Sequence, residues 1–302
     1  MNYLVTGGAG FIGSHVARRL LDEGHEVLVL DDLSSGSLEK FPKGAQLETV
    51  DICDADAIRP FFRGVDGVFH LAALPRVSLS VEDPIRTHRV NVDGFLNVLV
   101  AARDAKVRRV VFSSSSAVYG AVARMPQREE ASADPLNPYA LQKHIGEGYA
   151  KLFSRLYGLQ TVSLRYFNVY GPGMADEGAY STVIAHFLLR RHAGLPLRID
   201  GDGAQTRDFV HVDDVAEANV RAMDSEAVGM GEVINVGSGR RFSVNEIAAM
   251  VGGPVQRGPA RAGDARDTLA DIRRAEDLLG WEPRVSLEDG IRRLLRGYRI
   301  ST

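Results

Sequence analysis

Tyr139 and Lys143 are a pair of residues whose types and spacing suggest a reaction. A spacing of four places a phenol and an ammonium on the same face of a helix, and Pro138 suits the start of that helix. A phenol with a pKa of about 10 is a poor base at neutral pH, but an ammonium about 4.5 Å away favours the phenolate by roughly 3–4 kcal/mol at an effective dielectric of about 20. The pair therefore predicts a tyrosine whose pKa is lowered by about two to three units, and a positively charged cofactor beside it would bring that pKa near 7, where general-base catalysis works best.

Four consecutive serines, Ser113–Ser116, follow an apolar, strand-like run that begins at Arg109. Open α/β sheets bind ligands at the carboxyl ends of their strands. An ordinary polar loop can also contain such a run. The serines gain weight because they, the Tyr139–Lys143 pair and a glycine-rich loop are all expected at one crevice.

The glycine-rich loop, residues 6–13, lies between a strand-like run and the start of a helix. Gly7, Gly10 and Gly13 are spaced three apart, which permits a tight turn, a close approach of the backbone to a pyrophosphate, and close packing of helix on strand. The N–H groups at the helix N-terminus would hold the phosphates. We therefore favour a dinucleotide-binding loop over a plain structural turn.

Asp31 follows the second strand-like run, eighteen positions after Gly13. A carboxylate at this place accepts hydrogen bonds from the adenosine ribose and repels a 2′-phosphate. No Arg or Lys lies between Asp31 and Glu39 to bind such a phosphate. The sequence thus predicts NAD rather than NADP.

Strand-like and helical runs alternate through the first half of the chain, which predicts an α/β fold with a Rossmann-type, doubly wound parallel sheet. The strands are expected at 3–5, 26–30, 47–50, 67–71, 109–113, 160–165 and 233–236. The helices are expected at about 11–23, 55–63, 81–105, 139–157, 182–193, 212–223 and 287–298. After residue 168 the rhythm changes, so we expect residues 1–168, with 207–238 returning, to form the NAD-binding domain. Residues 169–206 and 239–302 would form a smaller mixed α/β domain that binds substrate.

The composition is that of an ordinary globular protein: 302 residues, 45% hydrophobic and 25% charged, with a formal net charge of −3. This charge gives no reason to expect a nucleic acid or a membrane as partner. The single cysteine, Cys53, excludes an intrachain disulfide, and the eight histidines show no metal-binding spacing, so we expect no metal. No leader is visible before the first strand, which predicts a cytoplasmic protein.

Seven motifs lie along the chain: TGGAGFIG at 6–13, HLAA at 70–73, NVDGFLNVL at 91–99, SSSSAVYG at 113–120, YALQK at 139–143, RYFNVYGP at 165–172 and RDFVHVDD at 207–214. Together they resemble the extended short-chain dehydrogenase/reductase family. More narrowly, they resemble its NAD-dependent nucleotide-sugar epimerases of the UDP-galactose 4-epimerase type. The resemblance extends from residue 1 to about residue 300 and implies NAD as cofactor and a UDP-sugar as substrate.

The resemblance also implies roles for individual residues. Tyr139 would take the proton of the sugar 4-hydroxyl, Ser115 would hydrogen-bond that hydroxyl, and Lys143 would hold the nicotinamide ribose. The residues implied at the cofactor are Gly7, Gly10, Phe11, Ile12, Gly13, Asp31, Asp32, Ser35, Gly36, Asp51, Ile52, Leu71, Ala72, Ala73, Asn91, Ser113, Tyr139, Lys143 and Tyr166. Those implied at the substrate are Ser115, Ser116, Tyr139, Asn168, Thr182, Val183, Arg207, Arg261, Asp264 and Thr268.

The chain departs from the family at two places near the cofactor. The related epimerases often carry Lys or Gln where this chain has Leu74-Pro75-Arg76, so a cofactor contact is either missing or supplied by Arg76. The usual Asp-Asn after the second strand is Asp31-Asp32 here, which still favours NAD.

Ala117 bears on which reaction follows oxidation at C4. The dehydratases and decarboxylases of the family carry an acidic residue two before the Tyr-Gly of the serine motif, and Ala117 cannot move a proton. We therefore expect epimerisation of a UDP-hexose. A UDP-glucuronate 4-epimerase is the alternative, a decarboxylase or dehydratase is less favoured, and a non-catalytic NAD-binding regulator is remote because Ser115, Tyr139 and Lys143 are all present.

Two further expectations come from the resemblance. The position four after Asp264 packs against the C2 substituent of the sugar, and Thr268 there leaves room for an N-acetyl group, although Arg266 and Arg76 keep glucuronate open. The helices at about 81–105 and 139–157 would pair across a two-fold axis into a homodimer. Apolar residues that exceed one sheet-facing stripe on these helices include Val98, Leu99, Ile145, Leu152 and Leu156.

Overall fold

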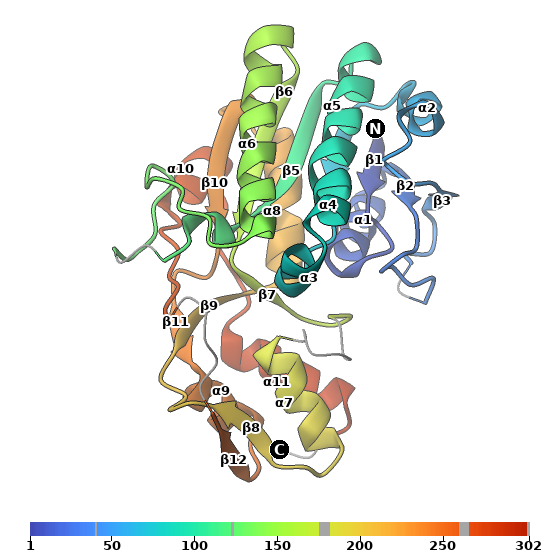
Figure 1. Cartoon of the computed structure of the whole chain (residues 1–302). Coiled ribbons are helices and arrows are strands. Elements are labelled where there is room, and N and C mark those ends of the chain that lie inside the picture. Colours follow the sequence, from blue (N-terminus) through green and yellow to red (C-terminus); the bar gives the residue numbers. More distant parts are fainter. Residues whose placement is uncertain (40, 122–123, 175–181, 260–265, 301–302) are drawn as a thin grey trace.

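A seven-stranded parallel sheet forms the larger part of the computed structural model, which describes residues 1–302 except 40, 122–123, 175–181, 260–265 and 301–302 (Figure 1). The strand order is β3-β2-β1-β4-β5-β6-β10. The strands are β1 (Asn2–Thr6), β2 (Glu26–Asp31), β3 (Gln46–Thr49), β4 (Gly67–His70), β5 (Arg109–Ser115), β6 (Gln160–Tyr166) and β10 (Met230–Val236). This confirms the Rossmann-type α/β fold.

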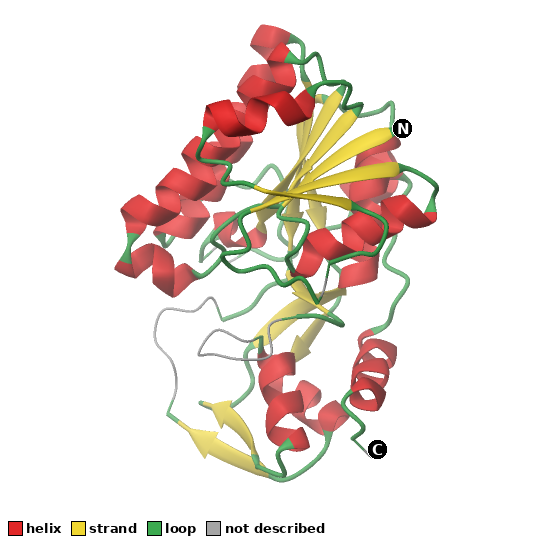
Figure 2. Ribbon diagram, turned by 90° about the vertical axis from the view of Figure 1, so that its right-hand side faces the viewer, coloured by secondary structure: helices red, strands yellow, loops and turns green. Residues whose placement is uncertain are grey.

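Helices cover both faces of this sheet, which is why its central strands read as continuous apolar runs (Figure 2). Tyr3 and Val5 of β1 face a core shared with α1 (Phe11–Asp22), α8 (Val212–Asp224) and α10 (Arg273–Leu279). Leu4 faces the opposite core. The elements on that face are α2 (Ala55–Ile58), η1 (Arg59–Phe62), α3 (Val77–Glu82), α4 (Pro84–His88), η2 (Arg89–Gly94), α5 (Phe95–Asp104) and α6 (Pro138–Tyr157).

A smaller domain lies below the carboxyl ends of these strands in Figure 1. It contains a three-stranded sheet of order β11-β9-β7 and a two-stranded sheet of β12 and β8. Its elements are β7 (Asn168–Tyr170), α7 (Val183–His192), β8 (Leu197–Asp200), β9 (Thr206–His211), β11 (Arg241–Ser243), α9 (Val244–Val251), β12 (Val255–Gly258) and α11 (Leu287–Gly297). Residues from α7, α9 and α11 form its apolar core.

The expected helix over 81–105 is in fact four shorter segments, α3, α4, η2 and α5. Pro84 has no N–H to continue a helix, and the Asp83 side chain accepts from Arg86 N at 3.0 Å, so a new helix begins there. The segment η2 (Arg89–Gly94) is π-helical. An apolar periodicity does not distinguish a continuous helix from one with a capped break and an inserted π-turn.

Two segments belong to a different domain from the one that the sequence predicts. β9, within the expected returning segment 207–238, pairs in the small sheet, whereas α8 and β10 join the large one. α10 and Trp281 pack in the core of the large domain, because Trp281 Nε1 donates to Asp214 O of α8 at 2.9 Å. Within the described residues, no helix is both long and apolar enough to cross a membrane.

Candidate active site

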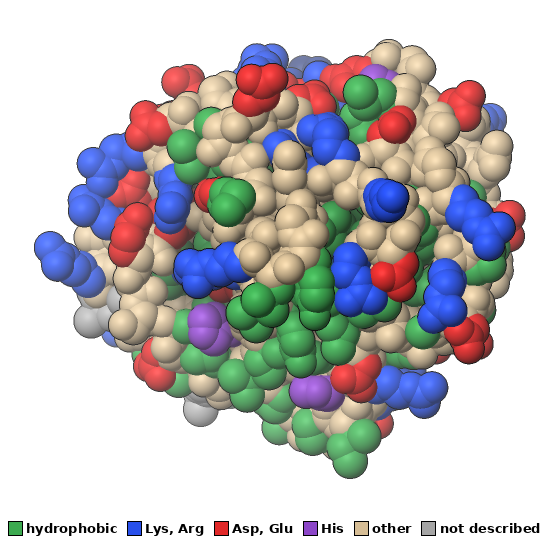
Figure 3. Space-filling view, turned by 90° about the horizontal axis from the view of Figure 1, so that it is seen from above, with side chains coloured by type: hydrophobic (Ala, Val, Ile, Leu, Met, Phe, Trp, Pro, Cys, Tyr) green, Lys and Arg blue, Asp and Glu red, His purple; other side chains and the backbone are tan. Residues whose placement is uncertain are grey.

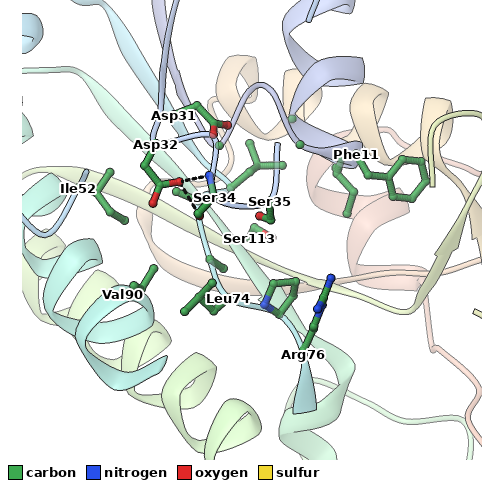
Figure 4. Close-up of a pocket in the computed structure, with 18 of the residues that line it drawn as sticks. Phe11, Asp31, Asp32, Ser34, Ser35, Ile52, Leu74, Arg76, Val90 and Ser113 are labelled. Atoms are coloured by element: carbon green, nitrogen blue, oxygen red, sulfur yellow. Dashed lines mark hydrogen bonds between the residues drawn. The ribbon is translucent and has the colours of Figure 1, made fainter. Parts of the chain in front are cut away.

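A cavity of about 650 Å³ opens at the carboxyl ends of the central strands, beside the smaller domain. Its walls are the segments that follow β1, β2, β3, β4 and β5, together with residues after β6. Figure 4 shows Asp31 and Asp32 on one side of this cavity, and Phe11 and Arg76 on the other. This is the edge at which open α/β sheets bind ligands.

The glycine loop forms the wall that follows β1. Gly7 has a φ of +71°, and a Cβ on it would lie 2.6 Å from Ala72 N. A Cβ on Gly13 would collide with the Gly7 carbonyl oxygen. Gly10 faces a different constraint: it lines the cavity as the N-cap of α1, and the nearest atom to an added Cβ is Gly7 O at 3.1 Å. Gly7 and Gly13 thus fix the turn, while Gly10 keeps the cavity floor free.

Asp31, the last residue of β2, binds the glycine loop through its side chain. Its Oδ2 accepts from Ala9 N at 2.9 Å, and its Oδ1 accepts from Leu33 N at 2.8 Å. Burial raises the pKa of Asp31, and these two hydrogen bonds act against that rise. The neighbouring Asp32 binds Ser34 through the contacts drawn in Figure 4. Asp31 therefore holds the glycine loop in place and also lines the cavity.

Helix α6 carries Tyr139 and Lys143 into the cavity. The side chain of Asn137 caps this helix by accepting from Ala140 N at 2.9 Å, and the Ser80 hydroxyl accepts from Tyr139 N at 3.1 Å. The Ser115 side chain faces the Tyr139 hydroxyl and acts to lower the pKa of that phenol. The predicted trio of serine, tyrosine and lysine therefore meets in one place.

The Lys143 ammonium is buried and directed at the serine strand. Its Nζ donates to Ser113 O at 2.8 Å, and lies 5.0 Å from the centre of the Phe112 ring and 5.9 Å from that of Tyr139. His70 also faces this region, and burial together with the Lys143 charge keeps its pKa well below the usual value.

The pKa expected for Tyr139 is not found in the protein by itself. Burial raises the pKa of Tyr139 to about 12, and only the Ser115 side chain acts against that rise. Burial lowers the pKa of Lys143 to about 7, against the attraction of Glu147. The expectation of a pKa near 7 counted the attraction of the Lys143 ammonium and of a bound, positively charged nicotinamide, but not the removal of Tyr139 and Lys143 from water.

Most of the residues expected at the cofactor and substrate do line the cavity. They are Gly7, Gly10, Phe11, Ile12, Gly13, Asp31, Asp32, Ser35, Asp51, Ile52, Leu71, Ala72, Ala73, Ser113, Ser115, Tyr139, Lys143, Tyr166 and Thr182. Gly36, Asn91, Ser116, Asn168, Val183, Arg207 and Thr268 are not among the residues that line it. Arg261 and Asp264 lie outside the described residues.

Asn91 supports the wall of the cavity from behind. It is 1% exposed, its Oδ1 accepts from Leu74 N at 2.7 Å, and its Nδ2 donates to Leu74 O and to Gln142 Oε1. Both ends of the amide are thus used to hold the loop after β4 against α6. Gly36 is similarly placed behind the glycine loop, where an added Cβ would lie 2.9 Å from Ala9 Cβ.

Asn168 and Thr268 lie together in the smaller domain. Asn168 Nδ2 donates to Asp208 O at 3.0 Å and to Thr268 Oγ1 at 3.4 Å, and Thr268 Oγ1 also accepts from Asp208 N at 3.2 Å. Arg207 Nη1 donates to Thr206 O and Arg266 O. These side chains hold strand β9 against residues 266–268.

The cavity has lining residues that the sequence did not single out as contacts. They are Leu30, Ser34, Val50, Cys53, Leu74, Pro75, Arg86, Arg89, Val90, Ser114, Phe167, Val169 and Met174. Arg86 and Arg89 are three apart at the junction of α4 and η2, a pattern that is also typical of a solvated helix face. Arg76, noted above at the departure from the family, lines the cavity as well (Figure 4).

The residues present suit a dinucleotide. Gly10 leaves the backbone at the N-terminus of α1 open to a pyrophosphate, and Asp31 lies at the end of β2 where a ribose would bind. The cavity volume lies within the range of roughly 300–1,000 Å³ typical of cofactor sites. Among the described residues, no group of three or more His, Cys, Asp or Glu is placed to hold a metal ion.

Comparisons with known proteins agree with this geometry. Residues 3–237 match the model of the NAD dependent epimerase/dehydratase family. The chain is 40% identical to the UDP-glucose 4-epimerase of Mycolicibacterium smegmatis, over 99% of each chain. It superimposes with a TM-score of 0.94 on the crystal structure of UDP-glucose 4-epimerase with UDP-glucose from Thermotoga maritima, at 39% identity and over 99% of each chain. A UDP-N-acetylglucosamine 4-epimerase from Methanobrevibacter ruminantium, in complex with UDP-N-acetylmuramic acid, gives a TM-score of 0.92 at 36% identity over 98% of each chain.

Proposed function

The chain belongs to the NAD dependent epimerase/dehydratase family, and we propose that it interconverts the C4 epimers of a UDP-hexose through a transient 4-keto sugar. The enzyme is an isomerase that uses NAD. The observation that carries this function is the meeting of Ser115, Tyr139 and Lys143 in a cavity that the glycine loop and Asp31 also line. We also propose that the enzyme acts in the cytoplasm.

In this proposal Tyr139 accepts the proton of the sugar 4-hydroxyl and later returns it, while Ser115 holds that hydroxyl by a hydrogen bond. NAD, when bound, would serve as the hydride acceptor and then as the hydride donor for C4. Its positively charged ring would favour the Tyr139 phenolate. Lys143 adds a second positive charge beside Tyr139 when it is protonated. The sugar must present its opposite face between the two hydride transfers for the configuration at C4 to change.

The acidic residues argue against dehydration or decarboxylation. The carboxylates found among the described lining residues are Asp31, Asp32 and Asp51, which lie at the end of β2 and in the segments after β2 and β3 rather than in α6 or β5. Ala117, in the 3-10 turn η3 (Ser116–Tyr119), has no group that could move a proton from or to C5. The site therefore favours simple oxidation and re-reduction at C4.

UDP-glucuronate remains the second candidate substrate because Arg76 and Arg86 line the cavity and could bind a carboxylate. The two candidates are separated by incubating the purified enzyme with UDP-glucose, UDP-N-acetylglucosamine and UDP-glucuronate and identifying the products by NMR. We expect the 4-epimers of the first two. Turnover of UDP-glucuronate alone, or release of carbon dioxide or water from the sugar, would contradict the proposal.

We further propose that Asp31 and the glycine loop bind NAD, and that Asn168, Thr182 and Arg207 face the nucleotide sugar. Thr182 supports this assignment because it both lines the cavity and caps α7, with its hydroxyl accepting from Ala185 N at 3.4 Å. Arg207 precedes Asp208, whose buried carboxylate accepts from Ser238 N, Gly239 N and Ala270 N. That anchoring would hold the substrate side of the site in a fixed position.

Replacing Thr268 with Tyr is expected to suppress turnover of UDP-N-acetylglucosamine at least about tenfold while sparing UDP-glucose, since discrimination by pocket size is worth roughly 10–200-fold. Thr268 lies beside Asn168 rather than in the cavity lining, and the longer tyrosine ring would extend from there into the room that an N-acetyl group needs. The measurement is kcat/KM for both substrates. Thr268→Val is the control, because it removes the hydroxyl bonded to Asp208 N without adding bulk, and both activities should persist. Equal losses for the two substrates in Thr268→Tyr would refute this view of the pocket.

We propose that the enzyme is a homodimer formed by α6 and the helices beside it. The outward side of α6 exposes Leu141, Leu152 and Leu156 by 48%, 48% and 67%. Val81 of α3 and Ile85 of α4 are exposed by 61% and 83%, and both helices pack beside α6. Hydrophobic side chains gather at the lower edge of Figure 3. This edge is the front of the molecule in Figure 1, where α4 and α6 lie. An apolar surface of this kind suits a second copy of the same surface.

Two of the apolar residues expected at this interface are in fact internal. Val98 and Leu99 are fully buried against the sheet within one chain. Their helix α5 follows the π-helical segment η2, so the outward face cannot be extrapolated from a regular 3.6-residue period. Ile145 is half-buried.

Replacing Leu152 with Arg is expected to convert the protein from a dimer to a monomer at micromolar concentration, because the charge would have to be buried in an apolar interface. Light scattering gives the mass directly. Leu195→Arg is the matched control, since Leu195 is equally exposed at 48% but follows α7 in the smaller domain. A wild-type protein with the mass of one chain would contradict the proposed dimer.

A further inference from the structure

We infer that Glu147 is a positioning residue for the reaction: its carboxylate fixes α6 on the serine strand β5 and places a negative charge beside the Lys143 ammonium. This inference rests on the proposed function, because it concerns how the same site is kept ready for catalysis. Glu147 lies one helical turn after Lys143, which itself lies one turn after Tyr139.

Three contacts join α6 to three consecutive serines of β5. Ser115 faces the Tyr139 hydroxyl, Ser113 O accepts from Lys143 Nζ at 2.8 Å, and Ser114 Oγ donates to Glu147 Oε1 at 2.6 Å. The first two of these contacts position the reacting groups. The third is set back from them and uses the strand residue between Ser113 and Ser115. Glu147 therefore fixes the position of α6 along its axis relative to strand β5.

The Glu147 carboxylate is itself held from the neighbouring strand. Arg165 of β6 donates from Nε to Oε1 and from Nη2 to Oε2, both at 2.8 Å, and each side chain is only 4% exposed. Arg165 and Ser114 are direct partners in the β5–β6 register, so both donors approach Glu147 from one rung of the sheet. The guanidinium also lies 4.5 Å from the centre of the Tyr119 ring, and Tyr119 OH donates to Asn235 Oδ1. Strands β5 and β6 therefore both hold the Glu147 carboxylate in place.

The ion pair is not well explained as a source of stability alone. Removing two charges from water is costly, and a buried pair repays that cost only when every polar atom is satisfied. Arg165 Nη1 is buried without a hydrogen-bond partner in the described part of the chain. The Glu147–Arg165 pair lies behind α6 and leaves that nitrogen unsatisfied. Its effect on Lys143 and on the position of α6 explains it better than stability does.

Among the groups around Lys143, Glu147 is the one whose charge favours the protonated form of the lysine. Burial alone favours the neutral amine, and the Glu147 carboxylate acts against burial. The other groups that face Lys143 carry no negative charge at neutral pH: Tyr139 on the same helix, the Ser113 carbonyl and Phe112 ring of β5, and the buried, neutral His70 of β4. Burial would raise the pKa of Glu147, but hydrogen bonds from Arg165, His144 and Ser114 outweigh it and hold that pKa below its ordinary value. Glu147 therefore stays ionised over the working range of pH.

The test measures the pKa of Lys143 directly, by NMR of protein with labelled lysine side chains; the chain has only five lysines, and the signal missing from Lys143→Met assigns the one of interest. In Glu147→Gln we expect the pKa of Lys143 to fall by at least about one pH unit. The alkaline limb of the kcat profile should move by the same amount, which lowers kcat at pH 8 at least about tenfold. If this variant does not fold, Glu147→Gln combined with Arg165→Met removes both buried charges, and the pKa of Lys143 must still fall, by less than in the single variant because the repulsion from Arg165 is lost as well.

Two controls separate positioning by charge from loss of a buried contact. Ser114→Ala removes one hydrogen bond to Glu147 but keeps its charge, so the pKa of Lys143 should hold. Glu217→Gln disrupts a comparable contact with Arg19 and Arg221 on the opposite face of the sheet, and it should change stability without moving that pKa. An unchanged Lys143 pKa in the Glu147 variant would overturn the inference, whether or not the wild type epimerises UDP-hexoses. Failure of the wild type to epimerise would instead count against the proposed function.

Discussion

Replacing Tyr139 with Phe is expected to reduce turnover by about 10²–10⁴-fold, the usual contribution of a positioned general base. The change removes only the hydroxyl that faces Ser115 and leaves the ring to line the cavity. Burial raises the pKa of this phenol to about 12 in the protein alone, so the positive charges of the bound cofactor and of Lys143 are needed to make it a base. The measurement is kcat with UDP-galactose, together with the melting temperature and the content of bound NAD.

Melting temperature and NAD content should match the wild type in the Tyr139→Phe variant. A suitable control is Tyr170→Phe, which removes another buried hydroxyl, one that donates to Ser286 O, but at a position outside the cavity lining. That variant should retain activity. If Tyr139→Phe kept more than a tenth of the wild-type rate, Tyr139 would not be the base.

Replacing Gly10 with Val is expected to abolish binding of NAD, and with it all activity. Gly10 has φ −81° and ψ 178°, which valine adopts readily, so the fold should persist. The branched side chain would stand where the pyrophosphate must approach the N-terminus of α1. The measurement is the dinucleotide released from the denatured protein, identified by chromatography; the wild type should release NAD and no NADP.

The control for this change is Gly297→Val, at the end of α11, where an added Cβ meets nothing within 4 Å. That variant should bind NAD as the wild type does. Retention of NAD by Gly10→Val would show that the glycine loop does not bind the pyrophosphate. NADP in the wild-type extract would instead show that Asp31 does not select the cofactor.

The sequence was informative wherever a local pattern has a single physical solution. Strands buried on both faces must be apolar throughout, and a glycine loop between strand and helix has few other uses, so the large sheet and the cofactor side of the cavity could be predicted. Tyr139, Lys143 and Ser115 could be placed together because the carboxyl ends of parallel strands share an edge.

The sequence was less informative where tertiary contacts decide. Asn91 stands in a motif typical of the cofactor site, and only the fold shows that its amide binds Leu74 and Gln142. No spacing rule reveals that burial shifts the pKa values of Tyr139 and Lys143 in opposite directions. The short strands β7, β8, β9, β11 and β12 lack a clear periodicity, because in such small sheets only their pairing with distant segments makes them strands.

The order of segments in the large sheet has a consequence for synthesis on the ribosome. Strand β10, helix α8 and helix α10 complete this sheet and one of its cores, yet they are translated after α7, β8 and β9 of the smaller domain. Until residue 236 has emerged, β6 is an open edge, and Val162 and Leu164 lack their cover from α8. Such an edge invites pairing with other chains. The nascent chain therefore carries this exposed edge while residues 167–236 are being made, which is the interval in which a chaperone would protect it.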